Sequence, residues 1–462
     1  MKLSRVLPVI LLGLAGVSAA AQVPTIGVAR YDLAPPSGLP PGDFTPRFGW
    51  SLAAADLDLD GLVTVIVGEP SYGTVPTELA GYIGLYESAF AADGASPVTE
   101  GVIHPPAELS TTITQLGTNL AIGDFDANGY PDIASWVYQL PGAPVGGGGV
   151  LVFYGPIADD GTAARTQTIR MPVGQRAYFG FGLAAGDFDG DGVFDLAVGQ
   201  PFSSYVTLFF GAAGANLGSP YGIGIAASDQ LGYGLAAFDP DGDGVSDLLI
   251  GAGHFRFNAG YAFWLPCGSR TPNPALARLI TPDQPTEVAR FCDYMVPINL
   301  SRAGGPLDRV LFGAWDWGLD QSLPGTLVMW ATNGRQRSIR QDRFGETVEV
   351  DGFGITPAFA RLDAAGFRGA LVVCGAPREA LDGADHVGVV NWAMRVWRES
   401  DGARFLLKGT FERTDPAHRQ PTTALGFGTA TAVADLNGDG LPDVVASDSA
   451  NAAAVVYVTG IL

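Results

Sequence analysis

The chain has few lysines, few histidines and little charge overall for its 462 residues. Lysine occurs only as Lys2 and Lys408, so arginine carries almost all of the positive charge. Acidic residues number 47 against 26 basic ones, and the net charge of −21 argues against a nucleic-acid-binding protein. None of the histidines falls in a recognisable nucleophile or catalytic metal motif; they are His104, His254, His386 and His418.

Cysteine is also scarce, with three residues in the whole chain. Cys267 and Cys292 are close in sequence and form the candidate disulfide in an oxidising compartment. Cys374 ends an apolar run and is expected to be a buried free thiol. Sequence cannot fix connectivity, so the alternative that all three are small core residues stays open.

No apolar stretch is long enough to span a membrane, and the longest candidate lies at the N-terminus. Lys2 and Arg5 precede an apolar run over residues 6–17, and residues 19–21 are alanines. This pattern predicts a signal peptide over residues 1–21, cleaved before Gln22, rather than a membrane anchor. No cysteine follows the run, which argues against a lipoprotein anchor. We expect a secreted, periplasmic or cell-surface protein that does not insert into a membrane.

Glycine and proline are abundant instead, at 64 and 33 residues, as is typical of many short strands joined by tight turns. One unit recurs: an aromatic residue or leucine followed by glycine, an acidic loop eight residues later, a short apolar run and a small-residue turn. Residues 179–201 form the clearest copy. The repeats start at Phe48, Leu116, Phe179, Leu231, Phe291, Phe353 and Phe427.

Each repeat continues into a run rich in aromatic and β-branched residues, and a weaker strand precedes the next start. Four short strands per repeat are typical of a propeller blade. The seven repeats therefore predict an all-β fold, a seven-bladed β-propeller with four antiparallel strands per blade, over residues 22–462. The last repeat has room for only three strands, so we expect residues 25–31 to pair near 455–458 and close the ring.

The acidic loops follow the pattern Asp-x-Asp-x-Asp-Gly-x-x-Asp, in which glycine at position six allows a sharp turn. Calcium takes about six to eight oxygens; side chains at positions one, three, five and nine and the carbonyl at position seven would supply them. Four loops are complete: Asp124, Asp126, Asn128, Tyr130 and Asp132; Asp187, Asp189, Asp191, Val193 and Asp195; Asp239, Asp241, Asp243, Val245 and Asp247; Asp435, Asn437, Asp439, Leu441 and Asp443.

A fifth loop has Asp56, Asp58 and Asp60 but Thr64 at position nine, so we expect weaker calcium binding there. The copies at residues 299–303 and 361–365 lack the carboxylates, and no metal is expected in them. An EF-hand needs glutamate at position twelve, where the loop that begins at Asp187 has Val198 in an apolar run. A solvated acidic turn without metal is the simpler alternative, and four complete matches at one fixed offset argue against it.

The unit resembles the FG-GAP repeat of integrin α-subunit propellers and of bacterial exported proteins. The matching motifs are Phe48-Gly49, Phe179-Gly180, Phe353-Gly354 and Phe427-Gly428, with the turns Gly68-Glu69-Pro70, Gly199-Gln200-Pro201 and Gly375-Ala376-Pro377. The sequence departs from this pattern with leucine at 116 and 231 and with Cys292 in place of glycine. The resemblance implies calcium in loops on one face and partner binding on the opposite face, in a free-standing relative without integrin leg domains.

Aromatic residues follow several of the small-residue turns and are expected on the face opposite the acidic loops. They are Tyr72, Trp136, Tyr138, Phe202, Phe255, Phe257, Trp315 and Trp317. Such a surface suits a protein or glycan ligand, although the same loops could simply pack on one another. We expect a monomeric binding or adhesion scaffold without catalysis and with structural calcium. The alternative is a secreted polysaccharide-active hydrolase or lyase.

Overall fold

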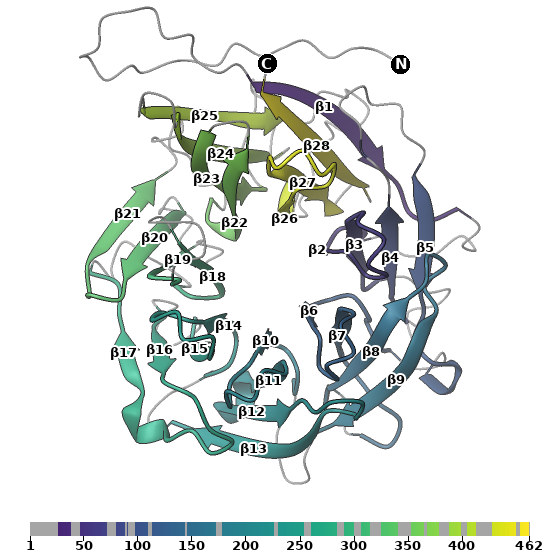
Figure 1. The fold of residues 1–462 in the computed structure, drawn as a ribbon. Helices are drawn as coiled ribbons and strands as arrows, with labels where there is room; N and C mark the ends of the chain where they lie inside the picture. The colour runs from purple at the N-terminus through teal and green to yellow at the C-terminus, as the bar shows by residue number, and fades with distance from the viewer. Residues whose placement is uncertain are drawn as a thin grey trace, which may run out of the picture.

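The fold is a closed ring of seven four-stranded antiparallel sheets, seen along its axis in Figure 1. The structure is a computed structural model. It describes residues 26–37, 47–71, 80–87, 90, 98–109, 113–143, 146–171, 178–225, 230–253, 260–283, 291–299, 306–314, 325–340, 353–364, 367–377, 388–398, 404–412, 427–449 and 453–461. The expected signal peptide over residues 1–21 lies outside them.

The first four blades each use four strands that are consecutive in the chain. Blade one contains β2 (Ser51–Ala55), β3 (Thr64–Glu69), β4 (Tyr82–Glu87) and β5 (Thr99–Ile103). Blade two contains β6 (Leu120–Gly123), β7 (Asp132–Val137), β8 (Gly149–Ile157) and β9 (Ala163–Arg170). Blade three contains β10 (Leu183–Gly186), β11 (Asp195–Gln200), β12 (Tyr205–Phe210) and β13 (Gly218–Gly224). Blade four contains β14 (Leu235–Phe238), β15 (Asp247–Gly251), β16 (Ala262–Leu265) and β17 (Arg278–Ile280).

The next two blades repeat this order, and the seventh closes the ring. Blade five contains β18 (Tyr294–Ile298), β19 (Arg309–Ala314), β20 (Thr326–Ala331) and β21 (Gln336–Arg340). Blade six contains β22 (Ile355–Ala364), β23 (Phe367–Ala376), β24 (Val389–Arg398) and β25 (Arg404–Glu412). Blade seven contains β26 (Phe427–Ala434), β27 (Asp443–Asp448), β28 (Ala453–Ile461) and the N-terminal β1 (Ile26–Leu33). Short 3-10 turns are η1 (Ala107–Leu109), η2 (Pro201–Ser203) and η3 (Pro274–Leu276).

The ring is closed by the pairing of β1 with β28, as the sequence predicts. Their register runs from Ile26 opposite Ile461 to Leu33 opposite Ala454. Figure 1 shows the purple β1 lying beside the yellow β28, far from it in sequence. This pairing gives the last blade its outer strand, so each described blade has the same number of strands.

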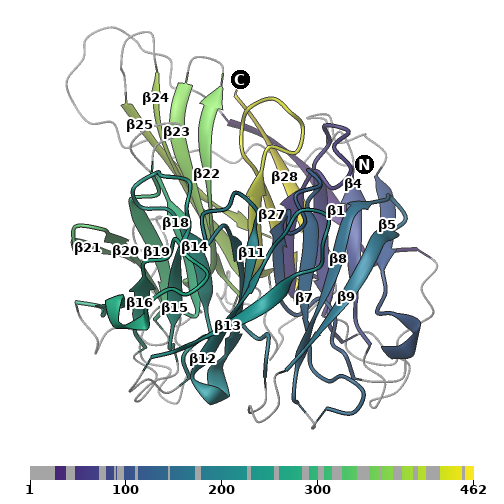
Figure 2. The ribbon, with the colours of Figure 1, turned by 60° about the horizontal axis from the view of Figure 1, so that its bottom comes forward.

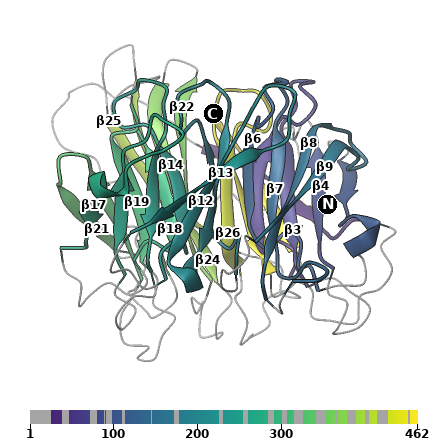
Figure 3. The same cartoon turned by 90° about the horizontal axis from the view of Figure 1, so that it is seen from below.

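The core is divided among the junctions between neighbouring blades, which Figures 2 and 3 show from the side. Between blades two and three, Ala134 and Val150 pack in one cluster with Leu196 and Val198. The second strand of a blade is therefore covered on both faces, and β7 and β11 are buried along their whole length. The outer strand β9 instead alternates between partly buried and exposed residues, as a strand with one solvated face does.

The aromatic residue and glycine that start each repeat fix how closely two blades approach. Phe179 is fully buried, and Gly180 has a φ of +94° and donates its N–H to the carbonyl of Gly199 at 2.9 Å. A Cβ on Gly199 would lie only 2.0 Å from the Gly232 carbonyl oxygen of the next blade. In blade five, Cys292 takes the glycine position with a φ of +72°.

The three cysteines are free thiols, so the candidate pairing of Cys267 with Cys292 is wrong. Cys267 follows β16 at the acidic-loop end of blade four, where its N–H donates to Asp247 Oδ1. Cys292 lies at the opposite end of the strands and donates its thiol to the Tyr261 carbonyl at 2.7 Å. The two residues are therefore separated by the length of a strand. Cys374 is buried and accepts the Gly354 N–H, as expected for a core thiol.

Candidate metal centres

The acidic loops join the first and second strands of a blade, so those of blades one to four and seven lie on one face of the ring. We call each one the acidic loop of its blade. In four of these loops, carboxyl oxygens of three aspartates lie close to one another. One oxygen from each of Asp56, Asp58 and Asp60, of Asp124, Asp126 and Asp132, and of Asp187, Asp189 and Asp195 lies within 4.8 Å of the others. The same holds for Asp239, Asp241 and Asp243 in blade four.

Hydrogen bonds within each loop explain why these residues fold into a tight turn. In blade three, Asp187 Oδ1 accepts the Gly190 N–H at 2.7 Å and its Oδ2 accepts the Gly192 N–H at 2.8 Å. The two glycines have φ values of +82° and +86°, which a residue with a side chain rarely adopts. Position one therefore acts as the acceptor around which the rest of the loop winds.

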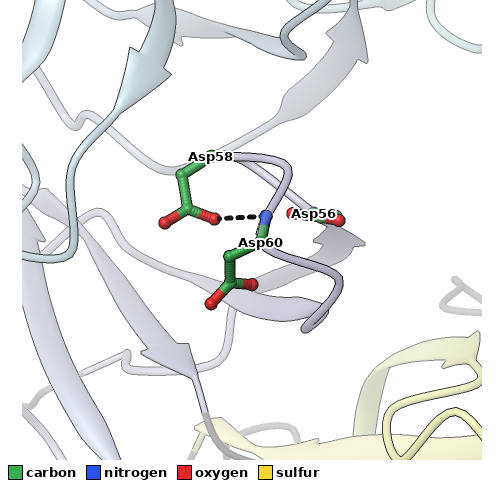
Figure 4. A group of neighbouring side chains, drawn as sticks. All are labelled: Asp56, Asp58 and Asp60. Carbon is green, nitrogen blue, oxygen red and sulfur yellow. Dashed lines mark hydrogen bonds between the residues drawn. The ribbon is translucent and has the colours of Figure 1, made fainter.

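The same arrangement recurs in the other acidic loops. Asp56 accepts the Gly61 N–H at 3.1 Å, Asp124 accepts that of Gly129 at 2.8 Å, and Asp239 accepts that of Gly244 at 3.2 Å. In blade seven, Asp435 accepts the Gly440 N–H at 2.8 Å. Figure 4 shows the blade-one loop, where the Asp60 N–H donates to Asp58. The described acidic loops thus share one backbone framework.

The carboxyl at position nine also accepts hydrogen bonds that hold the loop in place, which the sequence pattern does not reveal. Asp195 Oδ2 accepts the Phe188 N–H at 2.8 Å, and its Oδ1 accepts the Gly211 N–H at 2.9 Å. Both oxygens are therefore bonded to backbone, tying the loop to the end of the third strand. Asp132, Asp247 and Asp443 also accept two N–H groups each. Burial raises the pKa of Asp132, Asp195 and Asp443 to about 7, although these bonds lower it.

In blade one, Thr64 replaces the position-nine carboxyl, and a residue that the sequence analysis missed lies beside it. The Thr64 hydroxyl donates to Glu87 Oε2 at 2.8 Å. Burial, followed by neighbouring carboxylates that include Asp60 and Asp58, raises the pKa of Glu87. A carboxylate from β4 thus stands close to the loop that lacks one. The repeat pattern could not indicate this residue because Glu87 lies outside the loop motif.

The acidic loop of blade two carries a group whose chemistry fits a cation. Asp126 is 3% exposed; among the described residues its Oδ1 has no hydrogen-bond partner, whereas its Oδ2 pairs with Arg165 at 2.9 Å. A buried carboxylate oxygen without a partner is costly unless something neutralises it. The surrounding donors are oxygens of the kind that calcium prefers. The residues present therefore fit a hard divalent cation.

Neighbouring acidic loops are joined by backbone hydrogen bonds. The Phe194 N–H of blade three donates to the Asp124 carbonyl of blade two at 3.2 Å. The Ser246 N–H of blade four donates to the Asp187 carbonyl at 2.7 Å. In blade five, the Leu307 N–H donates to the Asp239 carbonyl at 2.8 Å. Position one of each of these loops is thus held both by its own glycines and by the next blade.

The two copies that lack carboxylates are described only in part. Asn299 ends the described stretch of blade five and is buried, and residues 300–303 lie outside the described ranges. In blade six, residues 361–364 continue strand β22, which is longer than the first strands of blades one to five. The pairing of β22 with β23 continues to Ala364 opposite Phe367, so residues 361–364 belong to a strand rather than to an acidic loop.

The aromatic residues expected on the opposite face have different outcomes. The expectation that Trp136 is an exposed contact residue is wrong. Trp136 is 2% exposed, and its ring stacks on that of Tyr178. It is buried because its side chain faces blade three, where the Phe181 ring lies 5.4 Å away. Tyr138 is half-buried, and Phe202 is 49% exposed. Tyr72, Phe255, Phe257, Trp315 and Trp317 lie outside the described residues.

One of the four histidines lies within the described residues. Of the histidines, only His104 is described, and partial burial lowers the pKa of its imidazole. His254, His386 and His418 lie outside the described ranges. Within the part of the chain that the structure covers, no helix has the length and apolar character needed to cross a membrane.

Comparison with known proteins locates two of the repeats independently. The family model described as "FG-GAP repeat" matches residues 179–219 and 427–458. These segments contain the acidic loops and flanking strands of blades three and seven. Each begins at a phenylalanine–glycine pair that the sequence spacing also selects.

The chain is similar in part to larger animal proteins. Phosphatidylinositol-glycan-specific phospholipase D of Rattus norvegicus is 30% identical over 167 residues, or 34% of this chain and 19% of the relative. Integrin alpha-PS3 of Drosophila melanogaster is 31% identical over 173 residues, or 36% of this chain and 14% of the relative. The matches thus span less than a fifth of these relatives' lengths.

Among solved structures, the Dos1 propeller aligns with 88% of this chain and 78% of its own, at a TM-score of 0.40 and 9% identity. The repeat match and the partial similarity to integrins rest on sequence and do not depend on this alignment. The chain therefore carries FG-GAP repeats on a seven-bladed β-propeller and has integrin alpha subunits among its relatives.

Proposed function

We propose that this chain is an exported calcium-binding propeller that acts as a non-catalytic binding scaffold, with calcium as a structural ion. The observation that carries the calcium assignment is the buried Asp126 Oδ1, which belongs to a group of three carboxylates and has no hydrogen-bond partner in the part of the chain that the structure describes. The blade-two, -three, -four and -seven loops would each take an ion, and the blade-one loop would bind one more weakly. Export is supported by the N-terminal sequence pattern over residues 1–21.

The ions would act by neutralising carboxylates that the fold brings together. Like charges a few ångströms apart cost about 1 kcal/mol per pair even in water. An ion that binds only the folded state adds about 2.7 kcal/mol at a hundredfold excess over its Kd. Several sites together would rival the ~5–15 kcal/mol stability of a typical domain. Calcium should therefore govern whether the ring stays folded.

Chelation tests this assignment. We expect the melting temperature to fall sharply in chelator and to return when Ca²⁺ is added back. Asp239→Ala should remove part of the calcium-dependent rise, while Asp363→Ala in blade six should leave it unchanged. A chelated protein that melts at the same temperature as the calcium-loaded one would refute structural calcium.

For the partner, we propose a protein or glycan ligand on the face opposite the acidic loops, bound by a monomer. A row of aromatic rings supports this face: Phe202 lies 4.8 Å from Tyr178, and Phe181 lies 4.6 Å from Tyr233 in the next blade. The Tyr138 ring of blade two lies 6.1 Å from that of Tyr178, so the row runs from blade two to blade four, and Phe202 exposes half of its surface. Exposed aromatic rings stack on sugars and anchor protein contacts.

The matched control for this face is Phe194, which is 43% exposed on the acidic loop of blade three. Glycan arrays and panels of purified surface proteins should identify a ligand for the calcium-loaded protein. We expect Phe202→Ala to abolish binding to that ligand and Phe194→Ala to preserve it. Equal effects of the two substitutions would place the ligand elsewhere.

An enzyme acting on polysaccharides is the second candidate function, and the partial similarity to a phospholipase keeps an enzyme class in view. Release of reducing ends or of unsaturated products from the polysaccharides that bind would favour it. Turnover that survives substitution of the histidines His104, His254, His386 and His418 would have to use other groups.

A further inference from the structure

The carboxylates of the blade-three loop already have a cationic partner, contributed by blade four. Arg270 lies in the turn after β16, and its Nε donates to Asp189 Oδ2 at 2.7 Å. Its Nη2 donates to Asp191 Oδ2 at 3.1 Å. The Asp189 side chain is only 3% exposed, so the guanidinium covers it. One arginine thus bridges positions three and five of the neighbouring blade's loop.

The oxygens that Arg270 contacts are those that the loop leaves free. Asp189 Oδ1 accepts the Asp191 N–H at 3.1 Å, and Asp191 Oδ1 accepts the Val193 N–H at 3.0 Å. Each carboxylate therefore uses one oxygen to shape the loop and presents the other outward. A calcium ion in this loop needs the outward oxygens, and a guanidinium donating to the same atoms stands in its way.

The blade-four loop offers a natural comparison because its ligand residues are the same. Both loops have aspartate at positions one, three, five and nine and valine at position seven. Among the described residues, no arginine or lysine forms an ion pair with Asp239, Asp241 or Asp243. Among the described residues, the blade-four loop therefore has the same ligand residues without an arginine across positions three and five.

Blade two shows an arginine that leaves room for an ion. Arg165 Nη2 donates to Asp126 Oδ2 and also to the Ala215 carbonyl at 2.7 Å. Asp126 Oδ1 stays without a partner. A cation could therefore bind Oδ1 while Arg165 stays bonded to Oδ2. At Asp189 and Asp191, by contrast, both oxygens of each carboxylate already accept hydrogen bonds.

We propose that Arg270 is a built-in competitor of calcium at the blade-three loop. Without the ion, its guanidinium neutralises Asp189 and Asp191 and ties the β16–β17 turn of blade four to blade three. Calcium binding displaces the guanidinium, so this loop binds calcium more weakly than the blade-four loop does. The turn keeps a second tie to blade three, because the Gly268 N–H donates to the Phe188 carbonyl at 2.8 Å. This inference rests on the proposed calcium binding.

Calorimetric titration of the full chain with Ca²⁺ tests the competition. Exposed ion pairs contribute about 0.2–1 kcal/mol each, and two such contacts correspond to a Kd change of about two- to thirtyfold. We expect Arg270→Gln to tighten one class of site within that range. The double variant with Asp187→Asn should lack the tightened class, which assigns it to blade three.

Two controls separate competition from the general effect of removing a positive charge. Arg278→Gln removes the same charge from neighbouring β17, where Arg278 lies 4.5 Å from the Trp264 ring, and should leave the Kd of the blade-three site unchanged. Arg270→Lys keeps the charge but loses the two-pronged geometry, so it should also tighten the site. Equal tightening by Arg278→Gln, or none by Arg270→Lys, would overturn the competition.

The melting temperature gives a second test, because Arg270→Gln should lower stability in chelator although it tightens calcium binding. In chelator, Arg270→Gln should melt below the wild type, because Asp189 and Asp191 lose their counter-ion. In saturating Ca²⁺ the two proteins should melt together. If the arginine stayed bound beside the ion, Arg270→Gln would lower the melting temperature in both conditions. That result would overturn the proposal. Wild-type protein that binds no calcium would refute the proposed function itself, whereas calcium binding unaffected by Arg270→Gln would refute only the competition.

Discussion

Glu69 is a carboxyl that the fold buries with an incomplete set of partners. It ends β3 on the face opposite the acidic loops and is 1% exposed. Its Oε1 accepts the Ser71 N–H at 2.9 Å, and its Oε2 has no hydrogen-bond partner among the residues that the structure describes. Burial raises the pKa of this carboxyl to about 7, against the lowering effects of N–H bonds and of Arg47.

This raised pKa makes stability depend on pH in a definite direction. The folded protein retains the Glu69 proton where the unfolded chain has lost it, so stability declines as pH rises from about 4.5 to about 7. We expect Glu69→Gln to stabilise the protein by about 1–3 kcal/mol at pH 8 and to have little effect at pH 4. Denaturant unfolding at both values measures this. A benefit of equal size at both pH values would contradict it.

Asp195 separates the folding role of a loop carboxyl from its role toward metal. Both of its oxygens accept backbone N–H groups, from Phe188 and Gly211, and an amide would point a donor at one of these donors. We therefore expect Asp195→Asn to cost about 1–3 kcal/mol even in chelator. Asp187→Ala is the comparison, because its larger effect should appear in the calcium-dependent part. If Asp195→Asn left the free energy of unfolding unchanged in chelator, position nine would be only a metal ligand.

At the scale of the strand, β1 is the element on which ring closure depends. Eight residues of β1 pair with β28, and its side chains Tyr31 and Leu33 are buried in the blade-seven junction. Removing residues 22–34 would expose β28 as an open edge. We expect the shortened protein to melt earlier and to form oligomers in light scattering. A monomer of unchanged melting temperature would show that β28 needs no partner.

Strand elements were predictable because the repeats are regular. The spacing from Phe179 to Asp187 sets the first strand of blade three, and the same offset recurs in the other blades. The seven-bladed ring and the pairing of β1 with β28 follow from that count, and the structure confirms both. A periodic pattern carries this information because every blade packs against its two neighbours in the same way.

What the pattern could not predict depends on contacts between blades. Trp136 follows a small-residue turn like the other aromatic candidates, but the geometry of blade three determines that it is buried. The Arg270 contact joins residues 81 apart in sequence, and no repeat offset indicates it. Calcium itself stays a prediction, supported by the loop geometry.

At the scale of the whole ring, the hydrogen bonds between acidic loops link neighbouring metal sites. Phe194 and Ser246 donate to the first residue of the preceding loop, so loosening one loop removes a partner from the next. We expect hydrogen exchange of these two amides to accelerate together in chelator, ahead of amides in β11. Asp239→Ala should reproduce the acceleration at Ser246 without chelator. Exchange at Ser246 that stays slow in both cases would mean the blades respond to calcium independently.

The antiparallel seam between β1 and β28 also determines how the molecule would respond to tension. The chain enters the ring at Ile26 and leaves it at Ile461, and these two residues are ladder partners at the same end of the seam. A pull on both flanks would load one pair at a time and open the blade like a zipper, rather than shear all eight pairs together. The six other blades lie outside that line of force. A propeller tethered on both sides would thus fail first at its seam, at low force, with most of the ring still folded.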